Sequence, residues 1–190
     1  MTNQINKTST IFAVFIMLIL MIATRGHTNW LSSANHLPDF TIPALFIAGV
    51  YFRTFWVAMV IIISAIAIDN YAIVHEGVSA NCITPAYSIL PLTYYGVFWV
   101  GKYLTALKID HHIIKNAAII IIASATQWLV TTMSYFAWTT SPWSKFSTYA
   151  LHWSMVEIPL VLYWMVAILV VFTFNHRYSV ISYFSTQKHH

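Results

Sequence analysis

Long apolar runs with almost no charge are the feature that most constrains the fold of this chain. From Phe40 to Ile68 the sequence is nearly continuous in apolar residues, and Arg53 is the one charged residue in that run. Across all 190 residues, 59% are hydrophobic and 7% are charged. A water-soluble domain of this size cannot bury the apolar surface of so many hydrophobic residues. We therefore predict an all-α integral membrane protein, because helices satisfy their own backbone polar groups inside hydrocarbon.

The chain is long enough for six transmembrane helices of about 20 residues each, in a single membrane domain of residues 1–190 with short loops. The apolar segments predict spans at about residues 10–24, 40–52, 54–74, 90–107, 113–135 and 151–174. No convincing small-x-small cleavage site follows the first run, so we interpret it as a span and not as a signal peptide. No nucleotide-binding motif is visible, so we expect no nucleotide cofactor.

The basic residues decide whether residues 40–68 form one helix or two that turn at Arg53. With two helices, the inner side collects Lys7, Arg53, Lys102, Lys108, Lys115, Arg177 and Lys188. Only Arg25 and Lys145 then remain outside, which agrees with the excess of Lys and Arg in cytoplasmic loops. We therefore predict two helices, with both chain termini in the cytoplasm. The net charge of +4 is then an orientation signal, and we expect no nucleic-acid partner.

The connection between residues 68 and 95 concentrates polar groups in an otherwise apolar sequence. It contains Cys82, the one cysteine of the chain, and also Pro85 and Pro91, which we expect to hold the segment in extended or turn geometry. A thiolate is a soft ligand for a transition metal, including a metal inside an organic cofactor. The alternative is that Cys82 packs as a small hydrophobe, the commoner role of a buried cysteine. Its position in a polar loop favours the ligand interpretation.

Carboxylates also gather on the outer side of the predicted topology. Asp39, Asp69 and Glu157 lie there, and a carboxylate in or at the edge of a span indicates a cavity, a partner or a pathway. The alternative is that each one caps a helix or meets a nearby hydroxyl. The outer histidines, which include His36, show no HxH or HxxxH spacing, so a zinc site built by the protein alone is a weak interpretation.

The chain resembles the BtuM family, cobalamin-specific S-components related to energy-coupling-factor (ECF) vitamin transporters. The resemblance lies in two runs, HLPDFTIPALFIAGVYFR from His36 to Arg53 and IDNYAIVHEGVSANCITPAYSILPLTYYGVFWVGKY from Ile68 to Tyr103. It implies a six-helix S-component-like bundle in the inner (cytoplasmic) membrane, which takes up cobalamin as its bound substrate. It also implies a pocket that opens outward and a loop cysteine, here Cys82, that ligates the cobalt.

The resemblance and the residues together nominate one set of site residues. The expected ligand-binding residues are Cys82, Asp39, Asp69, His36, Tyr87, Asn81 and Glu157. Corrin amides suit such polar partners. Six outer aromatic residues would pack on the ligand or form an interfacial belt, namely Trp30, Tyr71, Tyr87, Tyr94, Trp138 and Trp143.

The first predicted span departs from the S-component pattern. S-components that share an energising module present small residues in an Ala-xxx-Ala pattern there, whereas Ala13 and Ala23 lie ten residues apart. The resemblance therefore leaves open whether an ECF module is a partner or the protein works alone in the bilayer.

Three other functions stay open at this stage. The chain would be an S-component for another vitamin or tetrapyrrole, a membrane enzyme that uses the outer Cys, Asp, Glu and His residues, or a scaffold without a ligand. A limited enzymatic role overlaps the main interpretation, because a thiolate on one axial site of cobalt would promote loss of the opposite ligand.

Overall fold

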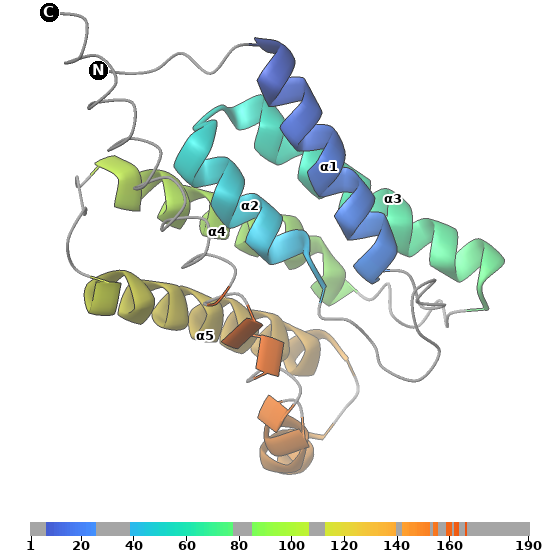
Figure 1. The fold of residues 1–190 in the computed structure, drawn as a ribbon. Coiled ribbons are helices and arrows are strands. Elements are labelled where there is room, and N and C mark those ends of the chain that lie inside the picture. The colour runs from blue at the N-terminus through green and yellow to red at the C-terminus, as the bar shows by residue number, and fades with distance from the viewer. Residues whose placement is uncertain are drawn as a thin grey trace, which may run out of the picture.

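The computed structural model describes residues 7–25, 39–77, 85–106, 113–139 and 142–152, and also residues 154, 155, 159, 160, 162, 163 and 166. This part of the chain is helical and contains no strand. The α-helices are α1 (Lys7–Arg25), α2 (Thr41–Tyr51), α3 (Phe55–His75), α4 (Leu90–Ala106) and α5 (Ile113–Trp138) (Figure 1). Two short 3-10 helices, η2 (Pro85–Ile89) and η3 (Trp143–Lys145), precede α4 and follow α5. The predicted all-α class is therefore confirmed for the described residues.

Two of the helices are long and apolar enough to cross a membrane. These segments are Phe55–His75 and Ala118–Trp138, and only 28% of each apolar window is buried within the protein. A helix in the core of a soluble protein would be mostly buried, so this exposed apolar surface agrees better with a helix that crosses a membrane. The predicted sixth span, residues 151–174, lies largely outside the described residues.

The apolar run from residue 40 to residue 68 contains two helices. α2 ends at Tyr51, and α3 begins at Phe55. Between them Arg53 has a φ of 54°, a left-handed conformation that is uncommon for a residue with a side chain. The Phe52 and Arg53 amides both donate to the Ala48 carbonyl oxygen, at 3.0 Å each. The turn therefore satisfies the end of α2 locally and reverses the chain at Arg53.

α2 and α4 pack so closely that their backbones touch. A Cβ atom placed on Gly49 would lie 2.2 Å from the Phe98 carbonyl oxygen, and one on Gly101 would lie 2.4 Å from the Phe46 carbonyl oxygen. Only glycine fits at these two positions, as in other close helix pairs of membrane proteins. Gly96, also in α4, has open space around it.

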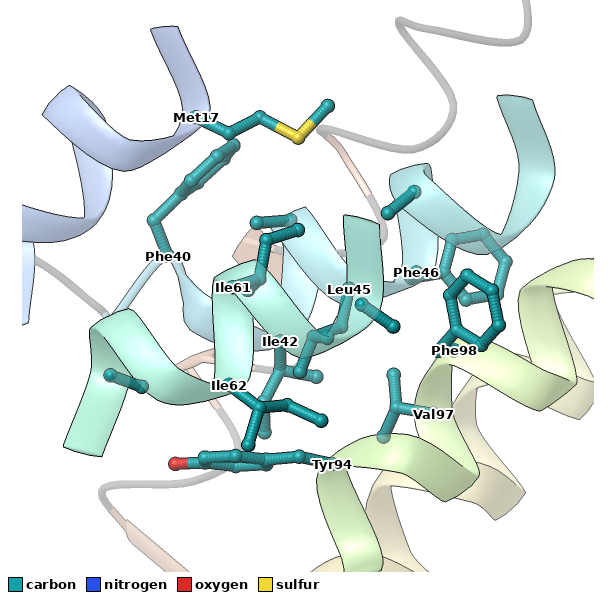
Figure 2. Packing of buried hydrophobic residues seen from close by; sticks show 14 of the residues in the cluster. Met17, Phe40, Ile42, Leu45, Phe46, Ile61, Ile62, Tyr94, Val97 and Phe98 are labelled. Carbon is teal, nitrogen blue, oxygen red and sulfur yellow. The ribbon is translucent and has the colours of Figure 1, made fainter. Parts of the chain in front are cut away.

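A single apolar core joins α2, α3 and α4 (Figure 2). Leu45, Ile61 and Phe98 are each at most 1% exposed. Met17 and Met21 of α1 and Ile120 of α5 extend the same cluster. Since these helices come from separate parts of the sequence, this core fixes how their ends meet.

The segment that follows Cys82 is more helical than we predicted. Pro85 opens η2, and Pro91 lies in the first turn of α4, which follows η2 without a gap. We expected extended or turn geometry for both prolines. They fit a helix start because amides of the first turn have no intrahelical acceptor, so proline removes no hydrogen bond there.

Candidate functional site

The side chain of Arg25, the last residue of α1, lies at the centre of a polar cluster. Its Nε donates to Asp69 Oδ1 at 2.7 Å, and one terminal nitrogen, Nη2, donates to Asp69 Oδ2 at 2.8 Å. The other, Nη1, donates to Asp39, to Thr41 Oγ1 at 3.1 Å and to Tyr94 Oη at 3.0 Å. The Arg25 side chain is 10% exposed. Its planar fork thus connects α1 with α2, α3 and α4.

Asp39 ties the start of α2 to this cluster. Its Oδ1 accepts from the Thr41 amide at 2.9 Å and from Thr41 Oγ1 at 2.6 Å, while Oδ2 accepts from Arg25. A neighbouring contact runs from the Phe40 amide to Thr24 Oγ1, at 3.1 Å. The Asp39 carboxylate therefore closes the first turn before α2 and joins it to α1.

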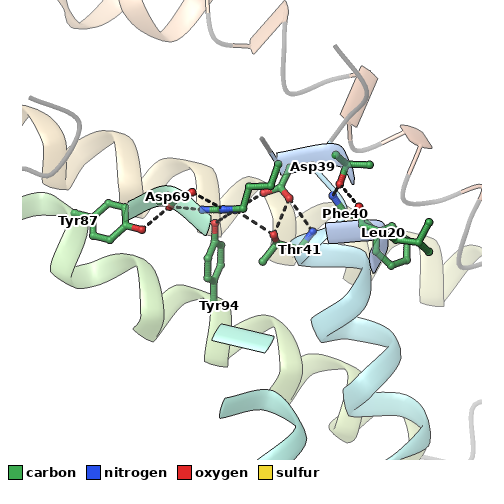
Figure 3. Close-up of polar contacts among 9 residues, drawn as sticks. Leu20, Asp39, Phe40, Thr41, Asp69, Tyr87 and Tyr94 are labelled. Carbon is green, nitrogen blue, oxygen red and sulfur yellow. Dashed lines mark hydrogen bonds and ion pairs between the residues drawn. The ribbon is translucent and has the colours of Figure 1, made fainter. Parts of the chain in front are cut away.

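Tyr87 ties η2 to the same cluster. Its hydroxyl donates to Asp69 Oδ2, from a position two residues after Pro85. Burial, and then the hydrogen bond to Asp69, raise the pKa of Tyr87 well above its ordinary value near 10. Tyr87 therefore stays a proton donor to Asp69 at physiological pH. Figure 3 shows Tyr87, Asp69, Tyr94 and Asp39 grouped at this end of the bundle.

The cluster keeps acceptor capacity for a further ligand. A carboxylate has about four lone-pair directions, and Asp69 and Asp39 each accept three hydrogen bonds from the groups named above. Their side chains are 21% and 31% exposed, so solvent or a ligand reaches both. The site can accept hydrogen bonds from amide or hydroxyl donors.

Two segments that carry nominated residues are closed by contacts of this cluster. Residues 26–38, which include His36, lie between Arg25 and Asp39, and those two residues are paired. Residues 78–84, which include Asn81 and Cys82, lie between α3 and η2, which the Asp69 to Tyr87 hydrogen bond joins. The cluster thus holds both ends of residues 26–38, and it closes the longer segment from Asp69 to Tyr87 that contains residues 78–84.

The structure brings together three of the seven nominated site residues. Asp39, Asp69 and Tyr87 all belong to the Arg25 cluster. The part of the chain that the structure describes does not include the other four, which are His36, Asn81, Cys82 and Glu157.

Sequence reasoning missed Arg25, Thr41 and the role of Tyr94. Tyr94 is 5% exposed and belongs to the core, where its hydroxyl accepts from Arg25. It is therefore not free to pack on a ligand. The signal that could have identified Arg25 is its location, because it is one of only two basic residues on the predicted outer side and lies at the end of the first apolar run.

Three other aromatic residues considered for ligand packing are exposed. Tyr71 is 57% exposed, Trp138 is 50% exposed and Trp143 is 55% exposed. Trp143 also contacts the ring of Phe136, with centroids 5.7 Å apart. Trp30 lies outside the described residues. The exposed rings agree better with an interfacial belt than with a closed ligand contact.

Comparison with known proteins identifies no family for this chain. No family model matches it, and no curated protein matches it. Within the part that the structure describes, which excludes Cys82 and His36, no group of three or more His, Cys, Asp or Glu residues could hold a metal ion. The resemblance to the BtuM family stays a prediction.

Proposed function

We propose that this chain is a cobalamin-binding protein of the inner membrane that mediates cobalamin uptake. In this proposal six helices cross the bilayer, both termini are cytoplasmic, and the pocket opens outward at the Arg25 cluster. Cys82 ligates the cobalt, and Asp39 and Asp69 accept hydrogen bonds from the corrin amides. The axial face of cobalt accepts a soft thiolate, which is why the loop cysteine is the central residue.

The observation that carries the proposal is the hydrogen bond from Tyr87 to Asp69 within the Arg25 cluster. This contact joins Asp69, within α3, to Tyr87, in η2, and so closes the segment of the chain that contains Cys82. A loop inside a segment that is already closed loses less entropy on binding, so the segment between Asp69 and Tyr87 presents its thiol at lower cost in free energy. The same cluster offers partly exposed carboxylate oxygens of Asp39 and Asp69.

The membrane placement has separate support. Apolar side chains cover the outward face of α1, where Phe12 and Phe15 are 64% and 58% exposed, and of α3, where Ile63 is 60% exposed. In water such a surface would aggregate, whereas in lipid it needs no partner. The described acids Asp39, Asp69 and Glu76 lie toward the end of the bundle that holds Arg25.

Absorbance spectroscopy of the purified protein with cobalamin tests the proposal directly. Thiolate coordination shifts the corrin bands, so the parent protein should show a shift that Cys82→Ser abolishes. Arg53→Gln is the matched control, because Arg53 is exposed and lies in the turn at the other end of α2. It should give the parent spectrum.

Other outcomes of the same experiment exclude the proposal or narrow it. Cobalamin that binds neither the parent nor the variant would overturn it. Binding with no band shift in either protein would reject Cys82 as the cobalt ligand. If the absorbance bands that report the upper ligand of cobalt stay unchanged when cobalamin binds, Cys82 does not assist removal of that ligand.

A further inference from the structure

The end of the bundle opposite the Arg25 cluster carries a basic and aromatic surface that the proposed function does not use. It is formed by Arg53, in the turn between α2 and α3, by Lys102, Trp99 and Tyr103 of α4, and by Trp56 of α3. We call these five residues the Arg53 surface. Arg53 is exposed, and the three other large side chains, Trp56, Trp99 and Tyr103, are 73%, 52% and 55% exposed.

Two contacts bring the turn and α4 together. The Lys102 backbone nitrogen lies 2.9 Å from a Cβ atom placed on Gly49, one helical turn before Arg53. On the other side of the turn, the ring of Phe55 packs edge-on against Tyr95, with centroids 5.7 Å apart. Arg53 therefore follows α2 next to the stretch of α4 that carries Trp99 and Lys102.

The charges on this surface have no acidic partner within the described part of the chain. Neither Arg53 nor Lys102 has an ion pair there, since the described acids Asp39, Asp69 and Glu76 lie toward the other end. The Lys102 Nζ atom instead lies 5.4 Å from the centroid of the Trp99 ring. This cation–π contact holds the ammonium group at the surface, where no acid among the described residues pairs with it.

The conformation of Arg53 agrees with a role for its side chain. A left-handed φ of 54° is unfavourable for arginine and suits glycine or asparagine. Arginine at such a position points to a use for the guanidinium group. A guanidinium group binds phosphate through two parallel hydrogen bonds, and an ammonium group adds a point charge.

We propose that Arg53 and Lys102 bind the headgroup of an anionic phospholipid in the inner leaflet. Trp56, Trp99 and Tyr103 set the depth of this surface at the interface, where amphipathic rings prefer to lie. The acyl chains of that lipid run along the exposed apolar face of α3, which includes Val60 and Ile63. The inference rests on the membrane placement proposed above, and it is independent of cobalamin.

Thermal unfolding in detergent micelles with added lipid tests this inference. Phosphatidylglycerol should raise the Tm of the parent protein by several degrees, and phosphatidylcholine should not, because a ligand stabilises the state that binds it. The double variant Arg53→Gln/Lys102→Gln should lose this rise. Lys145→Gln, which removes an exposed basic residue of η3, should keep it.

Two further measurements distinguish lipid binding from the other causes of a change in Tm. The charge-conserving variant Arg53→Lys/Lys102→Arg should keep most of the rise, which separates loss of charge from loss of folding. Inorganic phosphate should have no effect at matched concentration. An equal rise with both lipids, a rise that the double variant keeps, or a rise with phosphate alone would each overturn the proposal. Cobalamin spectra of the double variant should match those of the parent, so a failure here is distinguishable from a failure of the proposed function.

Discussion

Arg25 is the residue on which one end of the described bundle depends. It binds Asp39, which precedes α2, and Asp69, which lies in α3. Breaking a buried ion pair leaves an uncompensated charge in the protein. We expect Arg25→Gln to lower the free energy of unfolding by about 3 kcal/mol, the lower end of the range for buried pairs, because both carboxylates keep some solvent contact.

Unfolding in detergent by heat or by a denaturing detergent would measure this change. Lys145→Gln is the control, since Lys145 is exposed, and exposed substitutions usually change stability by less than about 0.5 kcal/mol. A loss of similar size in both variants would contradict a central role for Arg25.

Tyr87 makes the stability of the folded protein depend on pH in the alkaline range. Its pKa is raised in the folded protein by burial and by the hydrogen bond to Asp69. The folded state therefore keeps this proton at pH values where the unfolded chain has released it. The resulting stabilisation is complete below about pH 10, the ordinary pKa of tyrosine, and is lost as the pH rises above that value.

The comparison with Tyr87→Phe isolates this effect, because the other titrating groups are common to both proteins. Unfolding measured between pH 8 and 11, a range chosen around the ordinary tyrosine pKa of about 10, should show a constant difference at the lower values. Above about pH 10 the parent should lose stability relative to the variant. Parallel curves over the whole range would mean that the raised pKa is wrong.

At the scale of elements, α2 and α4 depend on two glycines. Gly49→Ala or Gly101→Ala would place a Cβ atom 2.2 Å or 2.4 Å from a backbone oxygen of the partner helix. Backbone atoms cannot move aside as a flexible side chain can, so the helices must separate. We expect a loss of about 2 kcal/mol or more, within the range for overpacking of a core.

Gly96→Ala is the matched control on the same helix. Nothing lies within 4 Å of a Cβ atom there, and alanine is a better helix former than glycine by about 1 kcal/mol. This variant should be neutral or more stable in the same unfolding assay. Equal destabilisation by all three substitutions would contradict a specific role for the close approach at Gly49 and Gly101.

The helix boundaries were the most predictable part of the fold. The ends of α1 to α5 differ from the predicted spans by at most three residues. Runs of apolar residues and the polar residues between them are local signals, so the sequence carries them directly. The 3-10 helix η2 was not predicted, because proline is equally common in turns and in first helical turns.

At the scale of the whole molecule, the single cysteine allows the predicted topology to be tested. A membrane-impermeant maleimide should label Cys82 from the periplasmic side in spheroplasts, because the proposal places this loop outside. In a Cys82→Ser background, Arg53→Cys should react only after the membrane is made permeable. Labelling of both sites from the same side would overturn the alternating topology of α2 and α3.

The sequence by itself determined the helical class, the apolar segments and three of the residues that meet at the cluster. Asp39 and Asp69 stood out because a carboxylate near the edge of an apolar span is expensive to bury, and Tyr87 was nominated by the resemblance to the BtuM family. This signal is visible one residue at a time, without knowledge of which segments are neighbours.

Only the tertiary structure decided that Arg25 joins these residues. Arg25 and Asp69 are 44 positions apart, and Arg25 and Tyr94 are 69 positions apart. Periodicity and composition describe single segments, whereas such partners depend on how α1, α3 and α4 cross. The backbone contact of Gly49 with α4 is equally hidden in the sequence, since a glycine shows what a position permits and not which helix approaches it.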